Sequence, residues 1–156
     1  MRIDPARIQK FSFAALALFS MTGGAIAQEA AARGRAYFAG ATIRGYDPFH
    51  GTQVEYHVPN GNCYLWYPGN TVILHGYWQF NGDDLCYRYP VSGINPSTGE
   101  PGEKWSCRNV DSRMRRIRER APGDILGLSR ASRPRFILPK DETTLADLLR
   151  EVRSRR

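Results

Sequence analysis

Apolar and polar side chains alternate strictly in residues 52–58. Val54, Tyr56 and Val58 face one way in an extended chain, and the polar residues that alternate with them, Glu55 and His57 included, face the other. This period of two predicts a half-buried β-strand.

Four further segments have strand character, and turn residues separate them. The predicted strands are Cys63–Tyr67, Thr71–Phe80, Leu85–Tyr89 and a fifth around Trp105–Val110. Asn-Gly in Pro59-Asn60-Gly61 predicts a type I′ turn, Pro68-Gly69 and Asn81-Gly82 mark two more turns, and Gly76 predicts a bulge or bend. Short strands with a turn about every ten residues predict a mainly β fold, a small antiparallel meander that forms a barrel or a sandwich.

The second and third predicted strands are apolar on both faces. In the third, Leu74 and Trp78 lie opposite Ile73 and Tyr77. A sheet with one wet face does not need this pattern, so another segment should cover the second face. Two apolar clusters near the C-terminus are the candidates, and we expect them to cross the sheet as a strap: Ile125–Leu128 and Phe136–Leu138.

Two helices are predicted in the C-terminal region. The first is short, Asp111–Arg120, and Pro122-Gly123 ends it. The second begins near Thr143 as cap and ends among arginines. Its apolar stripe has helical spacing and should dock on its own domain rather than on a partner: Leu145, Leu148, Leu149 and Val152.

The N-terminus has the pattern of a secretory signal. Basic residues precede the apolar run Phe11–Met21, and the small residues Ala25 and Ala27 occupy the minus-three and minus-one positions of a cleavage site. The alternative is an uncleaved anchor, but Phe11–Ala27 is at the short limit for spanning a bilayer. We therefore expect cleavage after Ala27 and a periplasmic or secreted protein in an oxidising space.

Charge divides the remaining chain into two unlike parts. Residues 28–107 have a net charge of −2 and contain 14 aromatic residues, whereas residues 108–156 have a net charge of +7 and contain one. Together with the strand pattern this predicts a signal peptide (1–27), a lead-in (28–50), an antiparallel β-domain (51–110) and a basic, partly helical C-terminal extension (111–156).

Three cysteines in an exported chain allow one disulfide and leave one cysteine over. Three pairings are conceivable, and we favour Cys86 with Cys107, because this bond would join the fourth and fifth predicted strands across the loop Asn95–Gly102. Cys63 would then be a buried apolar residue or a covalent partner site, and its role stays open.

Metal binding and catalysis have little support in the residue pattern. His57, Cys63, His75 and Cys86 match no zinc or haem spacing, so we expect no metal and no cofactor. No nucleophile elbow, zinc-protease helix or phosphate-binding loop is present in the sequence.

The strongest binding candidate is a group of arginines in the basic extension. An exported chain does not meet nucleic acid, and no aromatic residues are interleaved with these arginines to stack on bases, so we do not expect a nucleic-acid partner. Anionic envelope components, an acidic protein face or peripheral contact with a membrane surface are the expected partners. The alternative is a solvated charged face. The arginines are Arg113, Arg115, Arg116, Arg118 and Arg120.

A second candidate is aromatic. Tyr64 and Trp66 share one face of a predicted strand and could form a platform for stacking sugars. Packing of both rings in the core beneath the C-terminal region is the favoured alternative.

Several of these segments together resemble a group of small exported alphaproteobacterial proteins. The resemblance rests on Tyr64-Leu-Trp-Tyr-Pro-Gly-Asn70, Leu85-Cys-Tyr-Arg-Tyr89 and Trp105-Ser-Cys107, and it extends to Gly123–Leu128 and Phe136–Pro139. It covers roughly 90 residues, supports the exported location and the fold, and implies no catalytic residue. Cys63 departs from the pattern, and this strengthens the pairing of Cys86 with Cys107.

These observations predict an exported, non-enzymatic β-domain that binds an anionic envelope component or a protein partner through its basic extension. The alternative function is an envelope polysaccharide hydrolase that uses carboxylates such as Glu55 and Asp84.

Overall fold

The computed structural model describes residues 15–90, 93, 101–102 and 104–155, with side chains from Gly23 onward. The basic start of the predicted signal and part of its apolar run lie outside these residues, as does most of the loop Asn95–Gly102.

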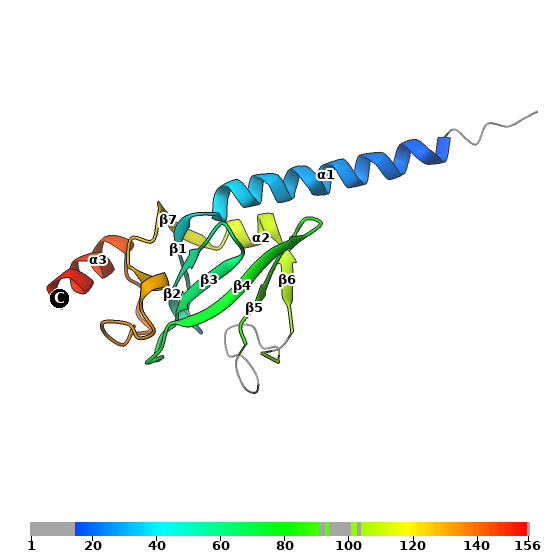
Figure 1. Cartoon of the computed structure of the whole chain (residues 1–156). Helices are drawn as coiled ribbons and strands as arrows, with labels where there is room; N and C mark the ends of the chain where they lie inside the picture. The colour runs from blue at the N-terminus through cyan, green and yellow to red at the C-terminus, as the bar shows by residue number, and fades with distance from the viewer. Residues whose placement is uncertain (1–14, 91–92, 94–100, 103, 156) are drawn as a thin grey trace, which may run out of the picture.

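One antiparallel sheet dominates the described structure and curls into a half-barrel (Figure 1). Its seven strands are β1 (Ala41–Asp47), β2 (Gly51–His57), β3 (Asn62–Trp66), β4 (Leu74–Asn81), β5 (Asp84–Arg88), β6 (Ser106–Asn109) and β7 (Ile117–Pro122). They follow the order β6-β5-β4-β3-β2-β1-β7, so consecutive strands pair except where β7 returns to lie beside β1. The predicted antiparallel meander is confirmed.

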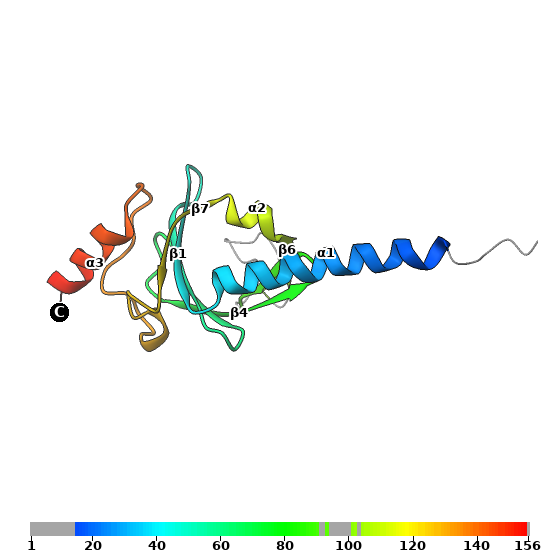
Figure 2. The same cartoon turned by 90° about the horizontal axis from the view of Figure 1, so that it is seen from above.

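Helices lie on opposite sides of this sheet (Figure 2). The long helix α1 (Ala15–Phe38) and the short α2 (Val110–Met114) lie on the concave side. On the convex side lie a short 3-10 helix, η1 (Leu128–Arg130), and α3 (Leu145–Ser154). In the described part of the chain, no helix combines the length and the apolar character needed to cross a membrane.

The concave side is filled by the end of α1. Phe38 is fully buried there, and Gly34 lies so close to the sheet that a Cβ atom would come within 2.6 Å of Phe80 and of Val110. A glycine at this position therefore lets the helix approach the strands. The buried side chains of this core are Ala30, Phe38, Ile43, Cys63, Leu65, Trp78, Leu85, Tyr87, Tyr89 and Val110.

The convex side is covered by the C-terminal region, as the strap hypothesis predicts. Phe136 packs edge-on against Trp66, with ring centroids 4.9 Å apart. The strap is also tied by its backbone, since Gly69 N–H donates to the carbonyl of Leu138 at 3.0 Å and Ile73 N–H donates to that of Ser132 at 2.9 Å. The buried side chains of this second core are Val54, Trp66, Ile73, Leu126, Leu128, Leu138, Leu145, Leu148 and Val152.

Helix α3 docks on its own domain by the predicted stripe, of which Leu145, Leu148 and Val152 are buried. Its N-cap is Thr144, one residue after the predicted Thr143, and the Thr144 hydroxyl accepts from Asp147 N–H. Glu119 of β7 adds a second acceptor for the N-terminus of this helix, because its carboxylate accepts from Leu145 N–H at 2.9 Å.

The sheet extends beyond the predicted β-domain at both ends. Strand β1 lies in the segment expected to be a lead-in, and β7 lies where the helix Asp111–Arg120 was predicted. That helix prediction is wrong after Met114, because Ile117–Pro122 pairs with β1 instead. The pairing joins Arg44, 5% exposed, to Glu119 at 2.8 Å.

Two turn predictions also need correction. Gly61 has a φ of 93°, but no described residue other than glycine has a positive φ, so Asn60 does not adopt the type I′ conformation. Gly76 keeps β4 in register with β3 and forms no bulge; it is required because a Cβ atom there would overlap the ring of Tyr89.

The predicted disulfide is confirmed. Cys86 and Cys107 are directly opposite each other in β5 and β6 and are bonded, while Cys63 is a buried free thiol.

Candidate functional site

A cavity of about 710 Å³ opens inside the half-barrel, and we call it the inner cavity. Phe38, Ile43, Leu65 and Tyr87 form its apolar and aromatic walls. Residues of β6, α2 and β7 also line it, so it lies along the seam that the two edge strands leave open. Its volume is in the range of sites for small organic ligands.

Arginines concentrate on the seam side of this cavity. Four of the five predicted arginines line it: Arg113, Arg115, Arg116 and Arg118. Arg108 of β6 joins them because β6 is the strand on the other side of the seam. Within the described residues, none of these five side chains forms an ion pair, so their charges face the cavity and solvent without neutralisation.

The fifth predicted arginine lies elsewhere. Arg120 Nε donates to the carbonyl of Tyr37 at 2.6 Å, and its guanidinium lies over the ring of the same tyrosine. Arg120 therefore attaches the C-terminal end of α1 to β7 and does not line the cavity.

Arg113 is the arginine placed most firmly. Its guanidinium carbon lies 5.1 Å from the centroid of the Tyr87 ring, as in a cation–π contact, and its buried Nε has no hydrogen-bond partner among the described residues. A buried guanidinium N–H without an acceptor lowers the stability of the fold unless a ligand or a water molecule accepts a hydrogen bond from it. An anion in the inner cavity would supply such an acceptor.

Polar side chains from neighbouring strands form a buried network at the cavity floor. His57 is fully buried, and its Nε2 lies 2.8 Å from the Tyr87 hydroxyl and 3.3 Å from the Glu55 carboxylate. The Tyr89 hydroxyl donates to the other oxygen of Glu55, and the thiol of Cys63 lies 3.8 Å from the same hydroxyl. Alternation along β2 predicted that Glu55 and His57 share a face; the curled sheet turns that face inward instead of toward water.

The hydrogen bonds of His57 determine its tautomer. Nε2 has two oxygen partners, whereas Nδ1 is buried and has none in the described part of the chain. The neutral ring therefore carries its proton on Nε2, because in the other tautomer the Nδ1–H would be a buried donor without an acceptor.

Burial sets the pKa of two groups in this network. Burial raises the pKa of the Tyr87 hydroxyl well above its ordinary value, and the nearby Glu55 carboxylate raises it further, although Arg113 opposes the shift. Burial likewise raises the pKa of the Cys63 thiol well above its ordinary value, again assisted by Glu55. Both groups are therefore protonated and act as neutral parts of the floor.

The turn between β1 and β2 forms a polar edge of the cavity. Burial alone would raise the pKa of the Asp47 carboxyl, but hydrogen bonds donated by the backbone of His50, its ring and the backbone of Phe49 lower it. Asp47 and Glu55 are the two carboxylates among the described lining residues, against five arginines. The electrostatic balance of the cavity is therefore positive.

The sugar platform that Tyr64 and Trp66 could form does not include Trp66. Trp66 is 1% exposed beneath Phe136, so its ring cannot stack on a ligand from solvent. Tyr64 is half-buried and stacks on His75, with ring centroids 5.1 Å apart. The core-packing alternative describes Trp66, since the strap covers it.

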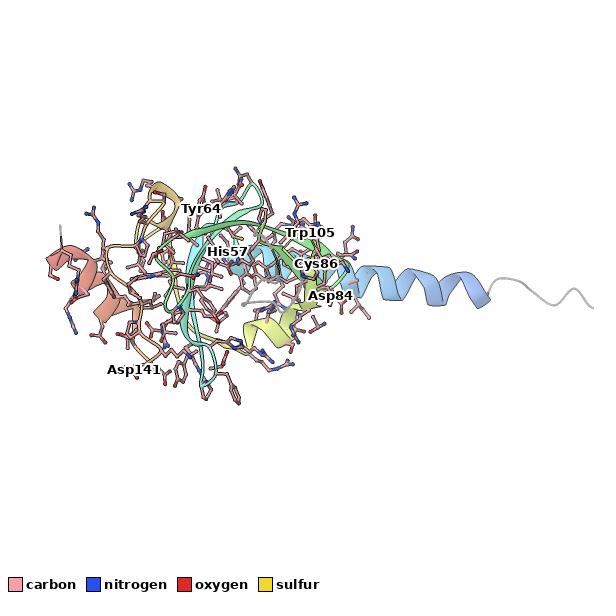
Figure 3. All side chains as sticks on the ribbon, turned by 90° about the horizontal axis from the view of Figure 1, so that it is seen from below. His57, Tyr64, Asp84, Cys86, Trp105 and Asp141 are labelled. Carbon is pink, nitrogen blue, oxygen red and sulfur yellow. A yellow bond between two sulfur atoms is a disulfide. The ribbon has the colours of Figure 1, made fainter. Side chains whose placement is uncertain are left out.

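The carboxylates of the hydrolase alternative do not meet in the inner cavity. Glu55 lines it, whereas Asp84 begins β5 and does not. Figure 3 shows Asp84 toward the α2 end of the molecule, apart from His57 in the middle of the half-barrel. Across the described chain, no three His, Cys, Asp or Glu side chains are grouped so that they could hold a metal ion.

Sequence reasoning missed two contributors to the site. Arg108 was not grouped with the other arginines, although its place in the predicted strand around Trp105–Val110 and its charge were both visible. Tyr87 was seen only as part of the predicted strand Leu85–Tyr89, and its role depends on the curl that brings β5 to the same interior as β2.

No protein-family model, no curated protein sequence and no solved structure matches this chain, so its own geometry carries the functional argument.

Proposed function

We propose that this chain is an exported, non-enzymatic β-domain that binds an anionic component of the cell envelope in its inner cavity. The single observation that carries the proposal is the convergence of five arginines from β6, α2, β7 and the turn between α2 and β7 on one cavity with aromatic and apolar walls. Guanidinium groups suit carboxylate and phosphate ligands because they donate in a planar fork.

Export is supported by three independent features. The N-terminal sequence has a signal pattern, the disulfide suits an oxidising compartment, and among the described side chains of α1 packing begins at Ala30, beyond the expected cleavage point. Cleavage after Ala27 would thus leave the contacts of α1 with the sheet intact.

The cavity selects its ligand by charge at the seam and by shape inside. An anionic group would contact exposed arginines such as Arg115 and Arg116, and its oxygens would accept a hydrogen bond from the buried Nε–H of Arg113. The rest of the ligand would lie against Ile43, Leu65 and the Tyr87 ring. A saccharide with acidic groups or a lipid headgroup fits this combination.

The test uses the mature, disulfide-bonded protein and two probes, an oligogalacturonide and vesicles that contain phosphatidylglycerol. At low salt we expect binding to at least one probe, and added salt should abolish it because the contacts are ionic. Substituting Arg115→Gln together with Arg116→Gln should weaken binding about tenfold.

The matched control removes two exposed positive charges outside both cavities, Lys140→Gln with Arg153→Gln, and should change the affinity less than twofold. Equal weakening by both pairs would show that net charge alone drives binding and would contradict a cavity site. Absence of binding to either probe at low salt would also contradict the proposal, and release of fragments from peptidoglycan would favour the hydrolase alternative.

A further inference from the structure

A second cavity, of about 280 Å³, lies on the convex side between the strap, α3 and the sheet, and we call it the outer cavity. Trp66 and Ile73 come from the sheet side, Leu149 and Val152 come from α3, and the strap supplies the remaining wall. The outer cavity belongs to the other core of the molecule, so the seam arginines have no part in it.

The strap wall of this cavity is held in one conformation. The Asp124 carboxylate accepts from Leu128 N–H at 2.8 Å, from Ser129 N–H at 2.9 Å and from the Ser129 hydroxyl at 2.7 Å. The wall is therefore formed before any ligand arrives, which lowers the entropic cost of binding.

The polar side chains that line the outer cavity are of one kind. They are Trp66, Arg130, Arg133 and Arg135, and indole and guanidinium groups donate hydrogen bonds but accept none. All other lining residues have aliphatic side chains or, in the case of Gly127, none. The lining thus combines an apolar surface with donors, and it differs from the inner cavity, where Asp47 and Glu55 supply acceptors.

Both kinds of donor in this lining, the indole and the guanidinium groups, are unpaired among the described residues. Trp66 is almost completely buried, and its Nε1 has no hydrogen-bond partner among the described residues. The three arginines are exposed, and no ion pair involving them occurs in the described part of the chain. Buried N–H groups in proteins are ordinarily satisfied, so the indole marks a place where an acceptor is missing.

We propose that the outer cavity is a second binding site, which takes a small aliphatic carboxylate. The carboxylate oxygens accept from the arginines at the rim and from the Trp66 indole where they reach it, and the alkyl chain lies against Ile73, Leu149 and Val152. A cavity of about 280 Å³ is at the small end of ligand sites, so a chain of medium length fits and a two-chain lipid does not. This site is independent of the proposed function.

The experiment follows the indole N–H resonance of Trp66 in the nuclear magnetic resonance spectrum of the mature, disulfide-bonded protein while octanoate is added. Trp66→Phe assigns the resonance. We expect saturable movement of the Trp66 signal with octanoate, and little movement with octylamine, whose charge is of the wrong sign. Octanol should bind more weakly than octanoate because it has no charge for the arginines.

Variants locate the site. Arg133→Gln with Arg135→Gln should weaken octanoate binding about tenfold, while Lys140→Gln with Arg153→Gln, which removes two exposed charges outside both cavities, should change it less than twofold. Arg115→Gln with Arg116→Gln also should leave it unchanged, so failure here and failure of the inner-cavity proposal are distinguishable. No movement of the Trp66 signal, equal binding of octylamine, or equal weakening by both charge-removing pairs would overturn the proposal.

Discussion

The rings of Trp66 and Phe136 meet edge to face, with centroids 4.9 Å apart and planes at 75°. This contact joins a strand of the sheet to the strap 70 residues later in the chain. Because aromatic pairs of this kind bury large apolar areas, the contact couples the stability of the sheet to that of the C-terminal region.

Phe136→Ala should lower the free energy of unfolding by about 2 kcal/mol, less than for a fully buried phenylalanine, because Phe136 is only half-buried. Urea denaturation measures the change. Ile137→Ala is the matched control: Ile137 is the next residue but is 50% exposed, so its truncation should cost little. Equal losses in the two variants would mean that the strap does not pack through Phe136.

The disulfide should contribute about 3 kcal/mol to stability, because it closes a loop of 21 residues in the unfolded chain. Reduction, or Cys107→Ser, should shift the urea midpoint down accordingly. Cys63→Ala is the control that keeps the bond. Thiol titration of the denatured, unreduced protein should find one free thiol, and a count of three would contradict the pairing.

Gly76→Ala should lower the free energy of unfolding by about 2 kcal/mol, because the added Cβ overlaps the Tyr89 ring and lies 3.0 Å from the carbonyl oxygen of Arg88. Moving Tyr89 also disturbs its hydrogen bond to Glu55. Gly45→Ala is a matched change in another strand, where the nearest atom would be 3.6 Å from the new Cβ. Urea denaturation should show a much smaller loss for Gly45→Ala, and comparable losses would contradict the close-packing explanation.

The parts of the fold that the sequence predicts are those in which local pattern and structure agree. Strand β2 follows alternation, β3 to β6 follow short strand-like segments between turn residues, and α3 follows its apolar stripe. Strand β1 was missed because the charged Arg44 is buried in it, and what allows that burial is Glu119, 75 residues away. Strand β7 was missed because its arginine-rich sequence has no apolar period that favours a strand over a helix.

The candidate site was predicted in its chemistry but not in its place. Charge alone pointed to Arg113, Arg115, Arg116 and Arg118, yet their convergence depends on β7 pairing with β1. The same charge count included Arg120, but the pairing of β7 with β1 places its side chain at the end of α1. Residue type therefore predicts what a site could bind, whereas long-range pairing determines which residues form it.

Alkaline pH should destabilise the protein through the buried network. The pKa values of Cys63 and Tyr87 lie above their ordinary values of 9.0 and 10.0, so the folded state holds these protons more tightly than the unfolded state. Their contribution is complete below the ordinary values and is lost as the pH rises above them. Urea denaturation across this range should therefore show stability falling from about pH 9 upward.

Tyr87→Phe separates the contribution of the Tyr87 hydroxyl to this pH dependence from that of Cys63. At neutral pH the variant should be less stable by about 1 kcal/mol, because the hydrogen bond between Tyr87 and His57 is lost. The difference should shrink as the pH rises above 10, since only the wild-type protein must keep a buried phenol protonated. A difference in unfolding free energy that stays constant with pH would show that folding does not raise the pKa of Tyr87.

Export as proposed requires that the mature N-terminus be Gln28. Among the described side chains of α1, those of residues 23–26 are exposed, while packing begins at Ala30 and ends at the fully buried Phe38. Removal of residues 1–27 should therefore leave the urea midpoint unchanged, whereas removal through Phe38 should lower it sharply by exposing Ile43 and Val110.

N-terminal sequencing of periplasmic material checks the cleavage point. Ala27→Arg should block processing because the minus-one position needs a small residue, while Ala32→Arg, exposed on the mature helix, should be processed normally. A chain that keeps residues 1–27 and contains three reduced thiols would contradict export.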